Sequence, residues 1–253
     1  MFPLRDENPR VHPPIATIAI IALNAFAWIV LQGFGNDPAL AASICKFGLI
    51  PGDVLGTAPA GSSFAVSHEL VCVLDGDGSY LNVLTSMFMH GGWFHIVGNL
   101  WFLWIFGDNV EDAMGSARFA AFYVLCGIGA AVAQMLTDTS SIVPMVGASG
   151  AIGGVMGAYA LLYPRAHIHT FIFLGFYMTT VAVPAVFMLG YWFLLQVLGG
   201  LPATAGEGGG VAFWAHIGGF LAGVVLVYLF TDSQRLSTHR QQATRRTSRH
   251  RWF

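Results

Sequence analysis

The sequence predicts an all-α membrane protein, a six-transmembrane-helix bundle with a long outer loop between helices 1 and 2. Three observations carry this prediction. Of the 253 residues, 55% are hydrophobic and only 9% are charged, against roughly 25% charged in a soluble domain. Several apolar runs have the length of about 17 to 25 residues that spans a bilayer. The cationic residues gather at alternate ends of these runs, which is typical of a multi-pass protein.

Six runs are predicted to span the membrane. They are Ile15–Phe34, Gly92–Phe106, Arg118–Leu136, Ser149–Tyr163, Val181–Leu198 and Ala212–Thr231. The second ends in the acidic residues Asp108, Glu111 and Asp112. The apolar stretch that begins at His167 is longer than one span, so its first part is expected at the membrane interface. The connection from Gly35 to Tyr80 is too polar to span and forms the long outer loop.

The charges divide the chain into three parts. Residues 1–14 are expected to be a cytoplasmic segment without signal-peptide character, 15–231 the membrane domain, and 232–253 a basic, disordered cytoplasmic tail. The tail holds six of the eleven Lys and Arg residues. Beside a membrane helix, such a tail favours anionic lipid over nucleic acid as its partner. With six helices, ten of the eleven cations lie inside and only Lys46 lies outside, as the positive-inside rule requires.

The three cysteines do not form a metal site by spacing. Cys45 and Cys72 both lie in the outer loop, so we hypothesise that they pair in an oxidising exterior. Cys126 lies within the third predicted helix and is expected to be buried. Because the sequence also has no phosphate-cradling glycine loop, we expect no cofactor and no metal. It carries no signal of oligomeric state.

A layer of polar residues is the candidate site. At 1.5 Å per residue, Ser149 lies about 9 Å below the outer face and His216 about 6 Å below it. His95 and Asn99 share one face of their helix and lie roughly 5 to 12 Å deep. Small or polar residues often serve only to pack or join membrane helices, and that interpretation of Ser149 alone is the simpler one. Together, however, a serine, a histidine base and neutral donors are the components of acyl transfer.

The motifs resemble those of the rhomboid family of intramembrane serine proteases. Gly147-Ala148-Ser149-Gly150 matches the family's GxSG, and Ala215-His216-Ile217-Gly218-Gly219 matches its histidine segment. His90, His95 and Asn99 fit its H-x4-H-x3-N helix. The resemblance covers about Ser86–Gly223 and implies a rhomboid-type bundle in which Ser149 is the nucleophile and His216 the general base. It also implies an oxyanion hole made by His95, Asn99 and the Ser149 N–H, with Gly147 and His90 in supporting roles.

The resemblance further implies that the substrates are transmembrane segments of other proteins. The outer end of the fifth helix and the Gly199–Gly210 loop would then gate their entry. Two departures from the family pattern stand out. Gly153 replaces the aromatic residue that follows the serine by four positions and stacks on the histidine, and the outer loop has no Trp-Arg pair. These departures put the orientation of His216 and the anchoring of the loop in question.

Two alternatives to an active intramembrane serine protease remain. One is a catalytically silent rhomboid-like protein that binds membrane clients, although such proteins usually lack the serine or the histidine. The other is a channel or transporter that uses the same polar layer, for which the expected charged pathway and inverted repeats are missing from the sequence. The compact layout is typical of a bacterial plasma-membrane protein with both termini in the cytoplasm.

Overall fold

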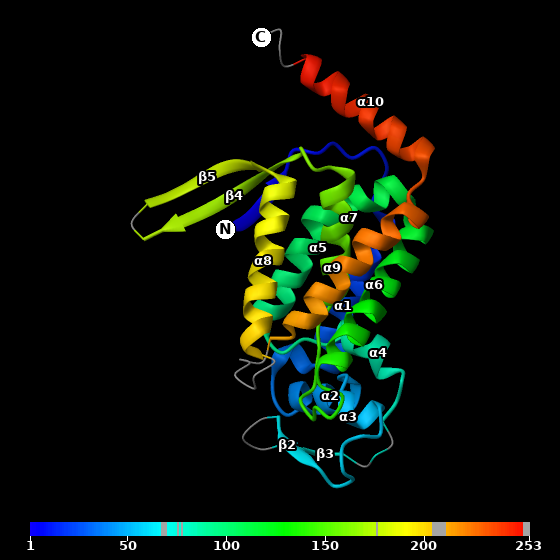
Figure 1. Cartoon of the computed structure of the whole chain (residues 1–253), viewed down its shortest axis with the longest axis vertical. Coiled ribbons are helices and arrows are strands. Elements are labelled where there is room, and N and C mark those ends of the chain that lie inside the picture. Colours follow the sequence, from blue (N-terminus) through cyan, green and yellow to red (C-terminus); the bar gives the residue numbers. More distant parts are fainter. Residues whose placement is uncertain (67–69, 75, 77, 176, 204–210, 250–253) are drawn as a thin grey trace.

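The computed structural model describes residues 1–66, 70–74, 76, 78–175, 177–203 and 211–249. The chain folds into an elongated bundle of helices that run lengthwise past one another (Figure 1). One end, here called the loop end, carries the segment between the first two long helices. The opposite end, here called the terminal end, carries the first residues, a β-hairpin and the C-terminal helix. Residues 204–210 of the expected entry loop lie outside the described residues.

The six long helices overlap the six predicted runs, and their ends differ from the prediction most for α5 and α8. They are α1 (Ile15–Phe26, continued by a π-helical turn Ala27–Leu31), α5 (Trp93–Met114), α6 (Ser116–Thr137), α7 (Ser149–Leu162), α8 (Ala185–Ala203) and α9 (Phe213–Phe230). By length and composition, α6, α9 and Ala185–Pro202 of α8 are able to cross a membrane. Ile15–Leu31 and α7 are apolar but shorter. The fold is therefore mostly helical and has the character of an integral membrane bundle.

Helix α5 does not end near Phe106, as the sequence suggested, but continues through the acidic residues to Met114. The reason lies at the start of α1. The buried Glu111 carboxylate accepts hydrogen bonds from the backbone N–H groups of Ala16 and Thr17 at 2.9 and 2.7 Å. Asp112 likewise accepts from the N–H groups of Val11 and His12, both at 2.9 Å. Glu111 thus satisfies free N–H groups at the N-terminus of α1, and Asp112 satisfies those of the segment before it. These hydrogen bonds make the burial of both carboxylates tolerable.

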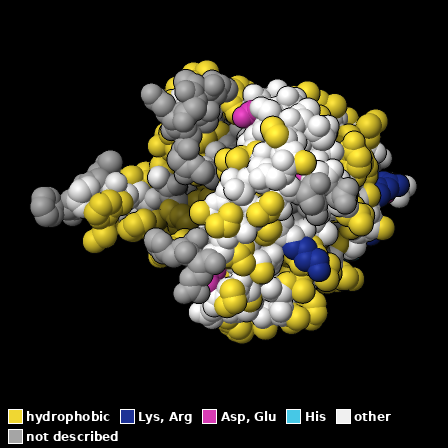
Figure 2. Space-filling view, turned by 90° about the horizontal axis from the view of Figure 1, so that it is seen from below, with side chains coloured by type: hydrophobic (Ala, Val, Ile, Leu, Met, Phe, Trp, Pro, Cys, Tyr) yellow, Lys and Arg dark blue, Asp and Glu magenta, His cyan; other side chains and the backbone are white. Residues whose placement is uncertain are grey.

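The stretch expected at the interface forms a β-hairpin, which sequence analysis did not predict. Strands β4 (His167–Leu174) and β5 (Tyr177–Pro184) pair antiparallel, and β1 (Phe2–Asp6) adds to β4 to give the order β1-β4-β5. The hairpin projects sideways from the bundle (Figure 1), and hydrophobic side chains lie along the described part of the projecting arm seen from the loop end (Figure 2). Val181 therefore belongs to a strand, and α8 begins at Ala185 and continues through Gly199 and Gly200 to Ala203.

The segment between α1 and α5, predicted as the outer loop, is built from short elements. They are a 3-10 turn (Gly33–Gly35), α2 (Ala39–Phe47), α3 (Pro51–Val54), β2 (Ser63–Ala65), β3 (Val71–Val73), α4 (Asn82–Thr85) and a 3-10 turn (Ser86–Phe88). Cys45 of α2 and Cys72 of β3 form a disulfide, as we hypothesised. Asn82 and Thr85 also donate side-chain hydrogen bonds to the carbonyls of Gly48 and Phe47 at 3.0 and 2.9 Å. These contacts join the short elements of the loop to one another without a Trp-Arg pair.

The basic tail is not irregular as expected. Residues Ser233–Arg249 form helix α10, which extends away from the terminal end (Figure 1). Asp232 caps this helix, because its carboxylate accepts the backbone N–H groups of Gln234 and Arg235 at 2.9 and 3.2 Å. These backbone hydrogen bonds hold the pKa of Asp232 below its usual value. An N-cap carboxylate of this kind favours a helix that composition alone does not predict.

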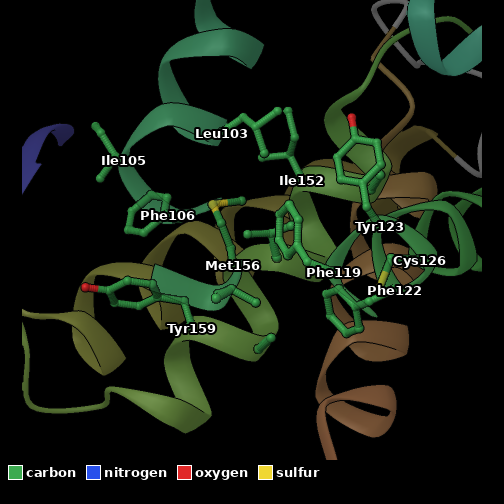
Figure 3. Close-up of a cluster of buried hydrophobic side chains, with 14 of the residues drawn as sticks. Leu103, Ile105, Phe106, Phe119, Phe122, Tyr123, Cys126, Ile152, Met156 and Tyr159 are labelled. Atoms are coloured by element: carbon green, nitrogen blue, oxygen red, sulfur yellow. The ribbon is translucent and has the colours of Figure 1, made fainter. Parts of the chain in front are cut away.

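The core lies where α5, α6 and α7 meet (Figure 3). Fully buried side chains from these three helices pack together there, namely Leu103, Phe106, Phe119, Phe122, Tyr123, Cys126, Ile152, Met156 and Tyr159. Cys126 is buried and unpaired, as expected. This aromatic and aliphatic centre holds α5 and α6 against α7, and so fixes the helix that begins at Ser149.

Glycines bring α7 and α9 into direct backbone contact. A methyl group on Gly219 would overlap the carbonyl oxygen of Gly150, and one on Gly223 would overlap that of Gly154. A methyl group on Gly157 would overlap the carbonyl of Phe220. Small residues at such positions let membrane helices approach closely. The contact sets the separation of the two helices that carry Ser149 and His216.

We therefore expect Gly219→Ala to destabilise the protein, by about 1 to 3 kcal/mol for overpacking. Gly190→Ala on α8 is the matched control, since a methyl group there meets no described atom within 4 Å. Thermal unfolding in detergent measures both. Equal melting temperatures for the two variants would contradict the close backbone contact.

A second prediction concerns Asp6 at the terminal end. Burial, opposed by the 2.6 Å hydrogen bond that the Tyr159 hydroxyl donates, raises the pKa of Asp6 to about 7. Between about pH 4 and 7 the folded protein therefore binds a proton that the unfolded chain has released. Its stability falls as pH rises through this window.

Asp6→Asn removes this titration, so its melting temperature should fall less than that of the wild type between pH 4 and 8. Thermal unfolding of both proteins across this range checks the difference. Parallel pH profiles would show that Asp6 titrates at its ordinary value.

Candidate active site

Ser149 is the first residue of α7, at the loop end of the bundle. The turn before it is held from two sides. Leu49 of the outer loop and Met145 exchange backbone hydrogen bonds of 2.9 and 2.7 Å, and the Gly147 N–H donates to the Ser86 carbonyl at 2.9 Å. Gly147 has a φ of +127°, and a methyl group there would lie 2.6 Å from His95 Nε2 and 3.5 Å from Ser149 Oγ. Only glycine fits this position.

His216 lies in the first turn of α9, beside the start of α7. Its Nε2 atom is 2.8 Å from Ser149 Oγ, within hydrogen-bond distance. The Gln134 side chain of α6 accepts the Ala215 N–H at 3.1 Å and so helps to fix the start of α9. The serine and the histidine that the sequence placed at one depth are thus in direct contact.

Two residues of α8 complete the surroundings of His216, and sequence analysis missed both. Gln196 Oε1 lies 2.8 Å from His216 Nδ1. The Trp192 ring lies beside the imidazole, with centroids 5.8 Å apart and planes inclined by 38°. A methyl group on Gly153 would lie 3.7 Å from Trp192 Cη2. Trp192 therefore packs beside the histidine next to Gly153, the position at which the family pattern has an aromatic residue.

His95 and Asn99 line the same site from α5. The Gly91 N–H donates to His95 Nδ1 at 3.2 Å. A neutral imidazole that accepts at Nδ1 carries its proton on Nε2, the atom that borders the Gly147 position next to Ser149 Oγ. Asn99 is buried, and its Nδ2 donor has no hydrogen-bond partner among the described residues. Both side chains thus have an N–H group available.

His90 lies behind this pair. It is fully buried, and its ring meets that of His95 edge to face at 5.2 Å. The Gln32 side chain fixes the His90 backbone, because its Nε2 donates to the carbonyl and its Oε1 accepts the N–H, both at 2.8 Å. His90 is therefore placed to orient His95.

A cavity of about 760 Å³ connects these groups to the loop end. Polar residues line its outer part, among them Gln134, Thr137, Asp138 and Ser141, and its inner wall includes Phe102, Met156 and Trp192. Ser149, His216, His95 and Asn99 all border it. Within the described part of the chain, no group of three or more His, Cys, Asp or Glu residues is suited to hold a metal ion. The arrangement offers a base, a nucleophile and donors, as acyl transfer requires.

The fold and the site together define a polytopic helical membrane protein with a serine–histidine pair in a cavity lined by both polar and apolar side chains. A family model described as the rhomboid domain matches residues 77–233, more than half of the chain. The protein belongs to the rhomboid family.

Relatives occur in organelles and in bacteria. Rhomboid protein 1, mitochondrial, of Saccharomyces cerevisiae is 29% identical over 181 residues, 69% of this chain and 48% of the relative. Rhomboid-like protein 11, chloroplastic, of Arabidopsis thaliana is 30% identical over 162 residues, 60% of this chain and 53% of the relative. Rhomboid protease GluP of Bacillus subtilis is 34% identical over 149 residues, which are 59% of this chain and 26% of the relative. The chain thus spans about half or less of these relatives, one of which is named a protease.

Proposed function

We propose that the protein is an intramembrane serine endopeptidase that cleaves peptide bonds in or near the transmembrane segments of other membrane proteins. The observation that carries this proposal is the 2.8 Å contact between His216 Nε2 and Ser149 Oγ in the cavity. Membership of a family that includes a named protease supports it. A silent client-binding protein would not need a serine hydrogen-bonded to a histidine.

In the proposed reaction, His216 Nε2 accepts the Ser149 hydroxyl proton while Oγ attacks the scissile carbonyl carbon. The imidazolium then returns the proton to the leaving amine nitrogen, and an acyl-enzyme remains. Water, deprotonated by the same histidine, attacks the ester and releases the second product. The polar side chains of Gln134, Thr137, Asp138 and Ser141 in the cavity lining support the entry of this water.

Charge builds up on the carbonyl oxygen during each attack. The Ser149 N–H lies at a helix N-terminus, where backbone N–H groups lack intrahelical partners. Together with Asn99 Nδ2 and His95 Nε2, it is proposed to form the oxyanion hole. Neutral donors suit this role at a membrane depth where a free charge would be costly.

We further propose that α1, α5, α6, α7, α8 and α9 cross the bilayer as the six predicted spans. The loop end would face outward and both termini the cytoplasm, in a bacterial plasma membrane. Lys46 of α2 lies at the loop end, whereas Arg10 and Arg118 pair with Asp108 and Asp232 at the terminal end. This distribution supports the orientation, with the basic helix α10 facing anionic lipid.

The proposal predicts that a serine-directed fluorophosphonate labels the wild type in detergent or liposomes. Ser149→Ala and His216→Ala should lose the label, since one removes the nucleophile and the other its base. In-gel fluorescence, alongside cleavage of a model transmembrane substrate, measures this. A folded wild type that neither labels nor cleaves would favour the silent client-binding alternative.

Asn99→Ala should lower kcat by about 10²- to 10³-fold, the usual cost of one oxyanion donor. Asn109→Ala is the matched control, because Asn109 is also a buried asparagine of α5 but does not line the cavity. Turnover of the model substrate by both variants checks the prediction. A loss of the same size in Asn109→Ala would assign the effect to packing instead.

A further inference from the structure

Gln196 is a buried polar residue on an otherwise apolar helix. Only 9% of its surface is exposed, and burying an amide is costly unless it is hydrogen-bonded. Its Oε1 lies 2.8 Å from His216 Nδ1. Its Nε2 donates to the Trp192 carbonyl, one turn earlier on α8, at 3.3 Å. Because the amide nitrogen is engaged by the backbone of its own helix, the oxygen is the atom that faces the imidazole.

This contact selects the tautomer of His216. An amide oxygen only accepts hydrogen bonds, so His216 Nδ1 must carry a proton to bond to it. A neutral imidazole has a single N–H, and Nε2 is then left with a free lone pair directed at Ser149 Oγ, 2.8 Å away. The other tautomer would carry its proton on Nε2 and present no base to the serine. We propose that Gln196 is a positioning residue that holds His216 in the Nδ1–H tautomer.

The proposal rests on the function proposed above, to which it adds a third side chain. In serine hydrolases with a triad, a carboxylate orients the histidine. At membrane depth an ionised carboxylate is expensive, and an amide fixes the same tautomer without a buried charge. An amide in place of the carboxylate has a cost, because a neutral acceptor stabilises the imidazolium less than a carboxylate does. Gln196 therefore positions the base more than it stabilises its charged form.

The register between α8 and α9 is fixed on both sides of this contact. Toward the loop end, the Trp214 indole N–H donates to the Gly200 carbonyl at 3.2 Å. Toward the terminal end, the rings of Phe193 and Phe220 lie 4.7 Å apart. Gln196 lies between these two contacts along α8, so its amide is held opposite Nδ1 by the packing of the two helices. The tautomer of the base thus depends on the position of α8.

Two substitutions test the role in activity. Gln196→Met removes the hydrogen-bond acceptor but keeps a similar side-chain volume. It should lower kcat by about ten- to hundred-fold with little change in KM. A loss of this size is part of the 10²- to 10⁴-fold rate enhancement that a general base contributes. Gln196→Glu restores an acceptor, and its carboxylate favours the imidazolium. It should retain activity and move the acid limb of the pH–rate profile to higher pH. Leu195→Met, at an exposed neighbouring position of α8, is the matched control and should behave as wild type.

A purely structural Gln196 predicts a different pattern. Both Gln196 variants would then lose stability together, and the acid limb of Gln196→Glu would stay in place. That result, or a Gln196→Met variant with wild-type kcat, would overturn the proposal.

The tautomer itself is measured without turnover. In protein labelled with ¹⁵N-histidine, the His216 signals are identified by their loss in His216→Ala. The wild type should show a protonated Nδ1 and an unprotonated Nε2, and Gln196→Met should shift the population toward Nε2–H. A wild-type His216 protonated on Nε2, or an unchanged ratio in Gln196→Met, would refute the assignment. Because this readout needs no substrate, a protein that proved inactive would refute the protease and leave the role of Gln196 to be decided by these spectra.

Discussion

The close approach of α7 and α9 is the constraint on which the site depends. Glycines at 150, 154, 219 and 223 leave no side chains between the two backbones, so the helices lie nearer than ordinary packing permits. Ser149 and His216 extend from the ends of these two helices that lie at the loop end, and their hydrogen bond forms only at this separation. The apolar centre that α7 shares with α5 and α6 holds α7 in place. Helix α8 closes the site on the side of the histidine.

Much of this was predictable from the chain alone. Apolar length located the helices, and counting residues along them placed Ser149, His216, His95 and Asn99 in one layer. The position of Gln196 beside His216 was not predicted, because a single polar residue twenty positions before the histidine gives no sequence pattern. Which side of α8 packs against α9 depends on the tertiary structure. The hairpin of β4 and β5 was not predicted, because an uninterrupted apolar stretch is equally compatible with a helix and with a buried strand. Helix α10 was not predicted, because the polar composition of the tail is typical of disorder. The hydrogen bonds that the Asp232 carboxylate accepts at its first turn favour the helix.

Several buried polar side chains of the bundle are held by hydrogen bonds to backbone groups. Glu111 caps the start of α1, and Asp112 binds the backbone of the segment that precedes it. Gln32 holds the backbone of His90, and Gln134 accepts from the start of α9. Such pairings offset the cost of removing polar atoms from water. They also define the geometry of the helix ends, where the candidate chemistry lies.

The dependence of His216 on α8 has a pharmacological consequence. If the chain is the protease proposed above, a compound lodged between α8 and α9, beside Phe193 and Phe220, would separate Gln196 from the imidazole and inhibit the enzyme without entering the cavity. Such an inhibitor need not resemble a peptide or carry a reactive group. Substitutions that confer resistance to it would arise at the contact between α8 and α9, whereas resistance to covalent inhibitors would arise around the serine.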